Sequence, residues 1–295
     1  MESTSLERRG FLKQTAGLAA GAAAATTLLA GLHDPEPAAA ASTLPDPSLN
    51  DTLRMYADLG RALAKPVAQR KWGMVIDVRK CIGCSACTVA CIAENNLPPG
   101  VTYRVVPEVE DGEYPNLKRF FMPTNCMQCD NPPCMEAANA IAPGSVEKRP
   151  DGIVALNYKK FKGEKVFKAA KKACPYTALY YDRGENYTDG TPAVQAYEQR
   201  ATSEYGQMVS RKDTKGVGRK CHFCQPRLEA GMLPACVTTC TGQAMHFGDL
   251  SDAESLVTQL LARHASIRLG ESEGTEPRVY YLDDEPQNTC ARCHE

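Results

Sequence analysis

Fourteen cysteines occur in this chain of 295 residues, which leaves disulfide bonds, metal binding or both as their chemistry. Their spacing distinguishes between these possibilities. A disulfide needs two Cα atoms within a narrow range of distances, and three thiols spaced closely along one loop cannot all find distant partners without distortion. Twelve of the cysteines lie in or beside such runs: Cys81-x2-Cys84-x2-Cys87-x3-Cys91, Cys126-x2-Cys129-x4-Cys134, Cys174 before a proline, and Cys221-x2-Cys224-x11-Cys236-x3-Cys240.

Thiolates at a Cys-x2-Cys-x2-Cys spacing can hold three corners of one 4Fe-4S cluster, and in two-cluster ferredoxins the fourth cysteine of the run binds the other cluster. A single Cys-x2-Cys pair is weak evidence, but four linked runs predict several clusters. Clusters held entirely by cysteine have no iron position open to a substrate, so the predicted chemistry is electron transfer. The alternative is a structural or metal-storage protein whose cysteines bind zinc.

The residues around these cysteines resemble a known family. The matching segments are Gly73-Met-Val-Ile-Asp-Val-Arg-Lys-Cys81, Cys126-Met-Gln-Cys129-Asp-Asn-Pro-Pro-Cys134, Ala173-Cys174-Pro-Tyr176 and Lys220-Cys221-His-Phe-Cys224. They resemble the iron-sulfur electron-transfer subunits of the dimethyl sulfoxide, polysulfide and tetrathionate reductase type, within the complex iron-sulfur molybdoenzymes, over roughly residues 72 to 282. The resemblance implies an α+β fold of two interleaved ferredoxin-like halves that usually hold four clusters, with helical extensions and an extended C-terminal arm.

The chain departs from this pattern at four ligand positions, which are occupied by Ala138, Phe161, Glu164 and Phe167. Under crossed ligation these positions serve one and the same cluster, so the resemblance implies that one site is lost as a whole. The remaining twelve cysteines divide without remainder into three 4Fe-4S sites. These are Cys81, Cys84, Cys87 and Cys240 for cluster one; Cys126, Cys129, Cys134 and Cys174 for cluster two; and Cys221, Cys224, Cys236 and Cys91 for cluster three.

The lost site is expected to be filled by protein. Phe167, Ala170 and Cys174 follow one another at the spacing of one helical face, which predicts a helix over residues 164–174. Phe161, Val166 and Phe167 would then occupy the volume of the missing cluster, because an empty cavity is costly. A solvated lysine-rich helix is compatible with this interpretation if the lysines face water.

The last two cysteines form a separate motif, Cys290-Ala-Arg-Cys293-His294. Cys-x-x-Cys-His is the attachment pattern of haem c, with His294 as the proximal iron ligand. A local disulfide between Cys290 and Cys293 or a contribution to a zinc site are the alternatives. The distal ligand is open, with His246, His264, a methionine or a residue of another subunit as candidates.

Residues 1–41 have the parts of an export signal. Arg8, Arg9 and Gly10 are followed by Phe-Leu-Lys, an apolar Ala- and Gly-rich run to Leu32 and small residues at 38–41. The adjacent arginines are typical of the twin-arginine type, which carries folded proteins. An uncleaved membrane anchor is the alternative. We expect a periplasmic mature chain with no transmembrane span, associated with the membrane through partner subunits.

The remaining pattern outlines the organisation of the chain. Leu49, Leu53, Tyr56, Leu59 and Leu63 predict an amphipathic helix before Pro66, and Ser251-Asp-Ala-Glu254 predicts a capping box for a helix ending near residue 265. Short strands are expected at 74–78, 152–156 and 179–181, and a closing strand near 274–281. The expected segments are an N-terminal helical extension (42–71), a first half with two clusters (72–122 and 213–250), a second half with one (123–182), a surface insertion (183–212), and a C-terminal helix, strand and haem tail (251–295).

Charge and composition exclude other classes of function. The chain has 34 Lys plus Arg against 35 Asp plus Glu, so it lacks the basic excess of a nucleic-acid-binding protein. Its five histidines form no recognisable nucleophile constellation, which argues against a catalytic site of its own. We expect an electron-transfer subunit between a quinone-reactive membrane subunit and, as the resemblance implies, a molybdopterin catalytic subunit. A multihaem cytochrome in a complex without molybdenum is the alternative partner.

Overall fold

The structure is a computed structural model that describes residues 50–192, 195–199 and 213–282. The predicted export signal and the predicted haem motif lie outside these residues. The described chain is a mixed α and β structure. Its helices are α2 (Asp51–Ala64), α3 (Ala86–Glu94), α4 (Pro133–Asn139), α5 (Glu164–Ala173), α6 (Ala196–Gln199), α7 (Gln225–Glu229), α8 (Ala235–Thr238) and α9 (Leu256–Arg263), with 3-10 turns at Val67–Gln69, Val78–Lys80 and Glu271–Glu273. Among these described helices, none is long and apolar enough to cross a bilayer.

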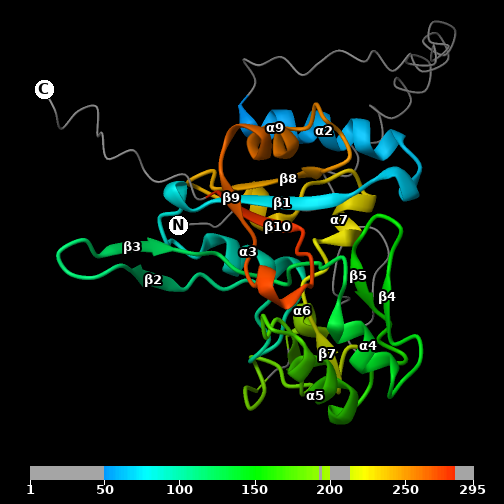
Figure 1. The fold of residues 1–295 in the computed structure, drawn as a ribbon. Helices are drawn as coiled ribbons and strands as arrows, with labels where there is room; N and C mark the ends of the chain where they lie inside the picture. The colour runs from blue at the N-terminus through cyan, green and yellow to red at the C-terminus, as the bar shows by residue number, and fades with distance from the viewer. Residues whose placement is uncertain (1–49, 193–194, 200–212, 283–295) are drawn as a thin grey trace, which may run out of the picture. The chain divides into compact units, whose positions relative to one another are not determined.

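A four-stranded sheet in the order β8-β1-β10-β9 forms the centre of one hydrophobic core (Figure 1). Strand β1 (Trp72–Asp77) is parallel to β10 (Val279–Leu282) and antiparallel to β8 (Met245–Asp249), while β9 (Ser266–Ile267) pairs with β10. Every residue of β1 is buried, as expected of a continuous apolar run covered on both faces. The strands predicted at 74–78 and near 274–281 are therefore present, and they are neighbours.

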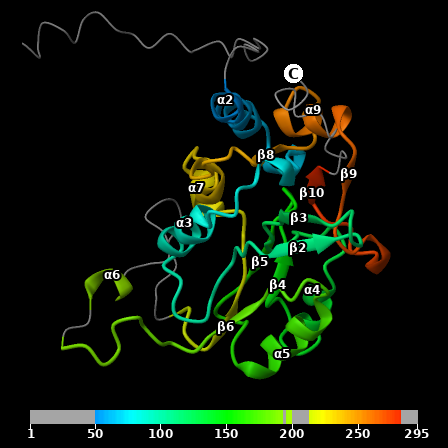
Figure 2. The same cartoon turned by 90° about the vertical axis from the view of Figure 1, so that its left-hand side faces the viewer.

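Helices α2 and α9 both pack against β8, and they lie beside this strand in both views of the ribbon (Figure 1 and Figure 2). Helix α2 confirms the predicted amphipathic helix, and Leu59 and Leu63 of the predicted apolar set pack in the core, but the buried face is turned away from Leu53 and Tyr56. Leu53 and Tyr56 are 50% and 38% exposed, whereas Asp58 is buried. Asp58 accepts hydrogen bonds from Leu256 N and Arg61 Nη2, which turns the Asp58 side of the helix toward α9.

The predicted start of the last helix at Ser251 is wrong, because α9 begins four residues later with Ser255 as its cap. Ser255 Oγ accepts the Thr258 N–H, which satisfies one of the free donors of the first turn. Ser251 is engaged elsewhere: its N–H and its Oγ both donate to Asp249 Oδ1 at the end of β8. The Ser251 hydroxyl is therefore engaged in a turn with Asp249 and does not cap a helix.

Three two-stranded ladders surround the cysteine-bearing segments. Strand β6 pairs with β7 through Tyr181 and Gly218, which brings the segment after Cys174 next to the segment before Cys221. The strands predicted at 152–156 and 179–181 are present with slightly shifted bounds. The ladders are β2 (Glu108–Asp111) with β3 (Lys118–Phe121), β4 (Val146–Lys148) with β5 (Val154–Leu156), and β6 (Tyr180–Asp182) with β7 (Val217–Arg219).

Helices α4 and α5 pack together around a second hydrophobic core, away from the four-stranded sheet (Figure 1). Helix α5 confirms the helix predicted over this segment, and its buried residues are Val166, Phe167 and Ala170. Ala138 and Phe161 are fully buried in the same core. The seven lysines in and before α5 are all exposed, as expected of a solvated outer face: Lys159, Lys160, Lys162, Lys165, Lys168, Lys171 and Lys172.

Glu164 differs from Ala138, Phe161 and Phe167, the other three residues that the resemblance places at ligand positions. It lies on the exposed side of α5 and pairs with Lys168, with 2.5 Å between its Oε2 and the lysine Nζ. Three of the four positions thus contribute to a dry core, and the fourth faces solvent.

Candidate metal centres

Four cysteines line each of three separate pockets. The pockets have similar sizes, about 290, 330 and 310 Å³ including the space open to solvent. All twelve of these cysteines are free thiols in the described part of the chain. The Cys81 pocket has Cys81, Cys84, Cys87 and Cys240; the Cys126 pocket has Cys126, Cys129, Cys134 and Cys174; the Cys221 pocket has Cys91, Cys221, Cys224 and Cys236.

These are the same sets that the resemblance to the family implies. Cys87 and Cys91 lie one turn apart on α3 yet face different pockets, because four residues of helix advance about 6 Å along the axis. Cys236 and Cys240 repeat this arrangement on and after α8, which packs against α3. Each of the two helical segments therefore contributes one thiol to each of two adjacent pockets.

The Cys-x2-Cys turns of the three pockets share one backbone feature. The residue just before the second cysteine has a positive φ in each: 68° at Gly83, 49° at Gln128 and 53° at Phe223. Left-handed residues in such turns direct successive N–H groups inward and create concavities that bind anions, including iron-sulfur clusters. At Gly83 the space is also restricted, since a Cβ there would stand 2.6 Å from the Phe121 ring.

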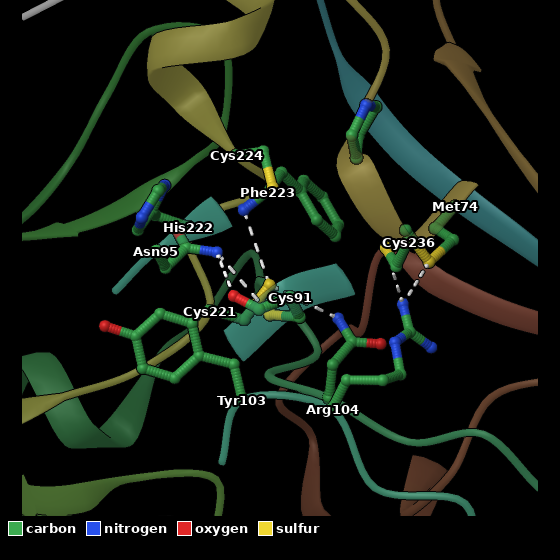
Figure 3. A pocket seen from close by; sticks show the side chains of 12 residues that line it. Met74, Cys91, Asn95, Tyr103, Arg104, Cys221, His222, Phe223, Cys224 and Cys236 are labelled. Carbon is green, nitrogen blue, oxygen red and sulfur yellow. Dashed lines mark hydrogen bonds between the residues drawn. The ribbon is translucent and has the colours of Figure 1, made fainter. Parts of the chain in front are cut away.

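Hydrogen-bond donors point at the sulfur atoms of the Cys221 pocket (Figure 3). Phe223 N donates to Cys221 Sγ over 3.4 Å, and Asn95 Nδ2 lies 3.5 Å from Cys91 Sγ. On the other side, Arg104 Nη2 lies 3.5 Å from Cys236 Sγ. Such donors stabilise negative charge on sulfur. The sequence motifs did not indicate Asn95 or Arg104, because neither lies next to a cysteine run.

Burial raises the pKa of most of these thiols. It raises the pKa of Cys134 and Cys129 to about 12 and that of Cys221 to about 11, with neighbouring thiols adding to the effect. At Cys84, which is exposed, a hydrogen bond with Thr241 lowers the pKa instead. Metal ligation by the buried thiols must therefore displace protons that they hold firmly.

The pocket residues fit an anionic cluster better than a single metal ion. Within residues 50–192, 195–199 and 213–282, no group of three or more Cys, His, Asp or Glu side chains is placed to hold one ion. A zinc ion would need sulfur atoms about 2.3 Å from its centre. Arg104 Nε and Nη1 are buried at the Cys221 pocket without a hydrogen-bond partner among the described residues. Unpaired buried donors are costly, so these two N–H groups fit an anion bound between the thiolates.

The histidines named as candidates lie in different environments. His246 is 1% exposed and its Nε2 lies 3.1 Å from Asp51 Oδ2, so this nitrogen is already engaged within the fold. His222 lines the Cys221 pocket, where its Nδ1 accepts the Gln225 N–H. Burial lowers the pKa of His222 to about 4, which keeps the ring neutral. His264 caps the end of α9. Cys290, Cys293 and His294 lie outside the described residues.

Comparisons with known proteins point to iron-sulfur subunits. A family model for a 4Fe-4S dicluster domain matches residues 117–190 and 187–250. One subunit of the selenate reductase of Mesobacillus selenatarsenatis is 45% identical, and the alignment covers 95% of this chain and 98% of that protein. The arsenate respiratory reductase iron-sulfur subunit of a Shewanella species is 33% identical over 71% of this chain and 95% of its own length. One subunit of the tetrathionate reductase of Salmonella typhimurium is 33% identical, covering 72% and 73%.

Proposed function

The chain belongs to the family of iron-sulfur electron-transfer subunits of the selenate, dimethyl sulfoxide, tetrathionate and polysulfide reductases, and from this membership we propose a specific role for it. It is an exported subunit that relays electrons through three 4Fe-4S clusters and one c-type haem. The electrons pass between a quinone-reactive membrane subunit and a molybdopterin catalytic subunit. It performs this role in a respiratory reductase for an oxyanion such as selenate.

The observation that carries the proposal is the division of twelve cysteines among three similar pockets, four to each. The Cys81, Cys126 and Cys221 sets would hold one cluster each, in agreement with the crossed pattern at α3 and α8. Bound 4Fe-4S clusters would supply one-electron oxidation and reduction. The chain holds the sulfur ligands, excludes water from most of them and donates hydrogen bonds to them.

The positions of the pockets support a relay. Cys87 of the Cys81 pocket lies one helical turn from Cys91 of the Cys221 pocket, and Gln128, in the turn of the Cys126 pocket, donates through Nε2 to the Cys221 carbonyl oxygen over 2.7 Å. The Cys221 pocket thus lies between the other two. Cys84 is exposed at one end of this series, where Ile82 beside it is 64% exposed. An exposed end suits electron exchange with another subunit.

The absence of a fourth cluster is part of the proposal. Ala138, Phe161 and Phe167 stand at three of the four positions that the family pattern assigns to cysteine, and all three are buried in the core between α4 and α5. This packing supports a site that is filled by side chains. The boundaries of the two interleaved halves, 72–122 with 213–250 and 123–182, belong to the same proposal.

Export and haem attachment rest on the sequence motifs. The twin-arginine pattern in residues 1–41 would deliver the folded chain to the periplasm, where haem c would be attached at Cys290 and Cys293 with His294 as proximal ligand. The haem motif also favours a second candidate partner, a multihaem cytochrome in a complex without molybdenum.

Purification of the native complex tests the role and separates the two partners. We expect the chain to be isolated with a catalytic subunit that contains molybdenum and with a membrane subunit, and we expect a quinol analogue to reduce its clusters. Co-isolation with a multihaem cytochrome and no molybdenum or tungsten would support the second candidate instead. A purified chain with bound zinc and no visible absorption near 400 nm would contradict both.

A further inference from the structure

Two cations are buried along the series of pockets. Arg104 and Lys220 are each 1% exposed. Arg104 lines the Cys221 pocket with Met74 and Cys236, and its Nη2 lies 3.0 Å from Met74 Sδ (Figure 3). The Lys220 ammonium group donates to the carbonyl oxygens of Val154 and Cys221.

Neither cation has a carboxylate partner in an ion pair within the part of the chain that the structure describes. Arg219, which is equally buried, shows the usual arrangement, with its Nη1 3.1 Å from Asp182 Oδ2. A buried cation without an anion is strongly unfavourable. The negative charge that balances Arg104 and Lys220 must therefore come from the pockets themselves.

The sulfur neighbours of each cation belong to two different pockets. Arg104 Nη2 lies 3.5 Å from Cys236 Sγ of the Cys221 pocket, and its charge also acts on Cys87 of the Cys81 pocket. Lys220 donates to the carbonyl oxygens of Cys221 and of Val154, which lines the Cys126 pocket, and its charge also acts on Cys126 and Cys134. The two cations are thus placed in the two gaps between three pockets.

We propose that Arg104 and Lys220 are the counter-charges between neighbouring clusters, and that each raises the reduction potentials of the two clusters that it separates. The proposal rests on the proposed function, because it requires clusters in the three pockets. A cluster with four thiolate ligands is anionic and becomes one unit more negative when it takes up an electron. A buried cation stabilises the reduced form more than the oxidised form, since Coulomb interactions are strong at low dielectric constant.

The two cations differ in their hydrogen bonds, and so they differ in whether they can donate to a cluster. Lys220 donates to two backbone carbonyl oxygens and acts on the clusters through its charge. Arg104 has two buried donors, Nε and Nη1, without partners among the described residues. These donors are available to sulfur atoms at the Cys221 pocket. Lysine in place of Arg104 keeps the charge and removes the planar set of donors.

When an electron passes between adjacent clusters, one cluster loses it and its neighbour gains it. The total charge around the intervening cation stays the same. Arg104 and Lys220 do not carry the electron. Each one reduces the electrostatic repulsion that an added electron would meet on either of the two clusters beside it.

Potentiometric titration followed by electron paramagnetic resonance tests the proposal on the purified full chain with its clusters. The variants are R104Q and K220Q, which remove one charge each, with K165Q on the exposed face of α5 as the control for net charge. We expect R104Q to lower the potentials of two clusters and K220Q to lower the potentials of two, with only one cluster shifted in both. K165Q should leave all three potentials unchanged. R104K should lower the same two potentials as R104Q by a smaller amount.

The pattern of shifts decides the outcome. Equal shifts of all three clusters, the same pair shifted by both variants, or no shifts would overturn the proposal. If R104Q fails to retain iron, K220Q carries the test, because it also removes a buried charge, and unchanged potentials of the clusters in the Cys126 and Cys221 pockets in K220Q would overturn the proposal. The wild-type iron content and spectrum are measured first. A wild-type chain without clusters would refute the proposed function, whereas normal clusters with unshifted potentials would refute only the inference.

Discussion

The aromatic ring of Phe161 lies directly against Gly218, where a Cβ atom on residue 218 would stand 2.3 Å from Phe161 Cε1. Gly218 belongs to β7, whose partner strand carries Tyr181, and Tyr181 in turn contacts the ring of Phe167 with 5.2 Å between ring centroids. The two phenylalanines are therefore parts of one packed unit between α5 and the β6–β7 ladder. This unit occupies the region where the family pattern has ligands for a fourth cluster.

Phe161→Ala is predicted to destabilise the protein by about 3 to 5 kcal/mol, because it opens a cavity in a core that is fully buried. Thermal unfolding followed by circular dichroism should show a clearly lower midpoint, while the iron content per chain stays the same. Lys165→Ala on the exposed face of the same helix is the control and should leave the midpoint nearly unchanged. A wild-type midpoint in Phe161→Ala would show that the ring does not fill this space.

The crossed arrangement at α3 predicts that Cys91→Ser and Cys174→Ser each remove one cluster but leave different pairs. Both should lose about four iron atoms per chain. Cys91 lines the central Cys221 pocket, so its loss leaves two clusters that are not neighbours, and their reduced signals should lack mutual magnetic splitting. Cys174 lines the Cys126 pocket at one end, so its loss leaves an interacting pair. Splitting that persists in Cys91→Ser and disappears in Cys174→Ser would contradict this order.

His246 is predicted to make the fold less stable in mild acid. Burial lowers the pKa of His246 below its ordinary value of about 6.5, although the hydrogen bond to Asp51 acts in the opposite direction. Below about pH 6.5, His246 takes up a proton in the unfolded chain more readily than in the folded chain. The contribution of this histidine to the free energy of unfolding is therefore complete above about pH 6.5 and decreases as the pH falls below it.

Thermal midpoints at pH 7.5 and pH 5.5 measure this contribution. His246→Asn should show a smaller decrease between the two pH values than the wild type, even if its midpoint is lower at both. Lys165→Ala, on the exposed face of α5, serves as the control and should keep the wild-type decrease. An unchanged decrease in His246→Asn would assign the acid sensitivity to other groups.

The haem motif gives a direct prediction for the terminal cysteines. The wild-type protein purified from a host that attaches haem c should give a haem-stained band at its own mass on a denaturing gel, because the thioether bonds survive denaturation. Cys290→Ser with Cys293→Ser should abolish the band and leave the iron-sulfur absorption in place. A wild-type band that stays unstained would leave a local disulfide or a zinc ligand as the role of these cysteines.

The resemblance to the family implied the sets of four cysteines that line the three pockets, in each of which one cysteine lies far from the others in the sequence. The apolar spacing at Phe167 and Ala170 predicted the buried face of α5. The first helix was predicted correctly, and so was the burial of Leu59, but Leu53 and Tyr56 are exposed because Asp58 bonds to Leu256 from a distant part of the chain and turns the helix. Ser251 was predicted as the cap of the last helix, but in the fold its hydroxyl donates to Asp249, and Ser255 is the cap.

Arg104 and Lys220 could not be recognised from the sequence. Arg104 and Cys236 are 132 positions apart, and their contact exists only because the folded chain brings both to one pocket. Lys220 directly precedes Cys221, but only the tertiary structure places its ammonium group beside Val154 and between two sets of cysteines. Single basic residues carry no periodicity or spacing signal, so their role depends wholly on tertiary placement.

Determination of non-haem iron and inorganic sulfide in the purified full chain tests the central claim most directly. Three clusters in the Cys81, Cys126 and Cys221 pockets predict about twelve of each per chain. About sixteen of each would mean that a fourth cluster is bound despite Ala138, Phe161 and Phe167, and it would contradict the claim that side chains fill the core between α4 and α5 in place of a cluster.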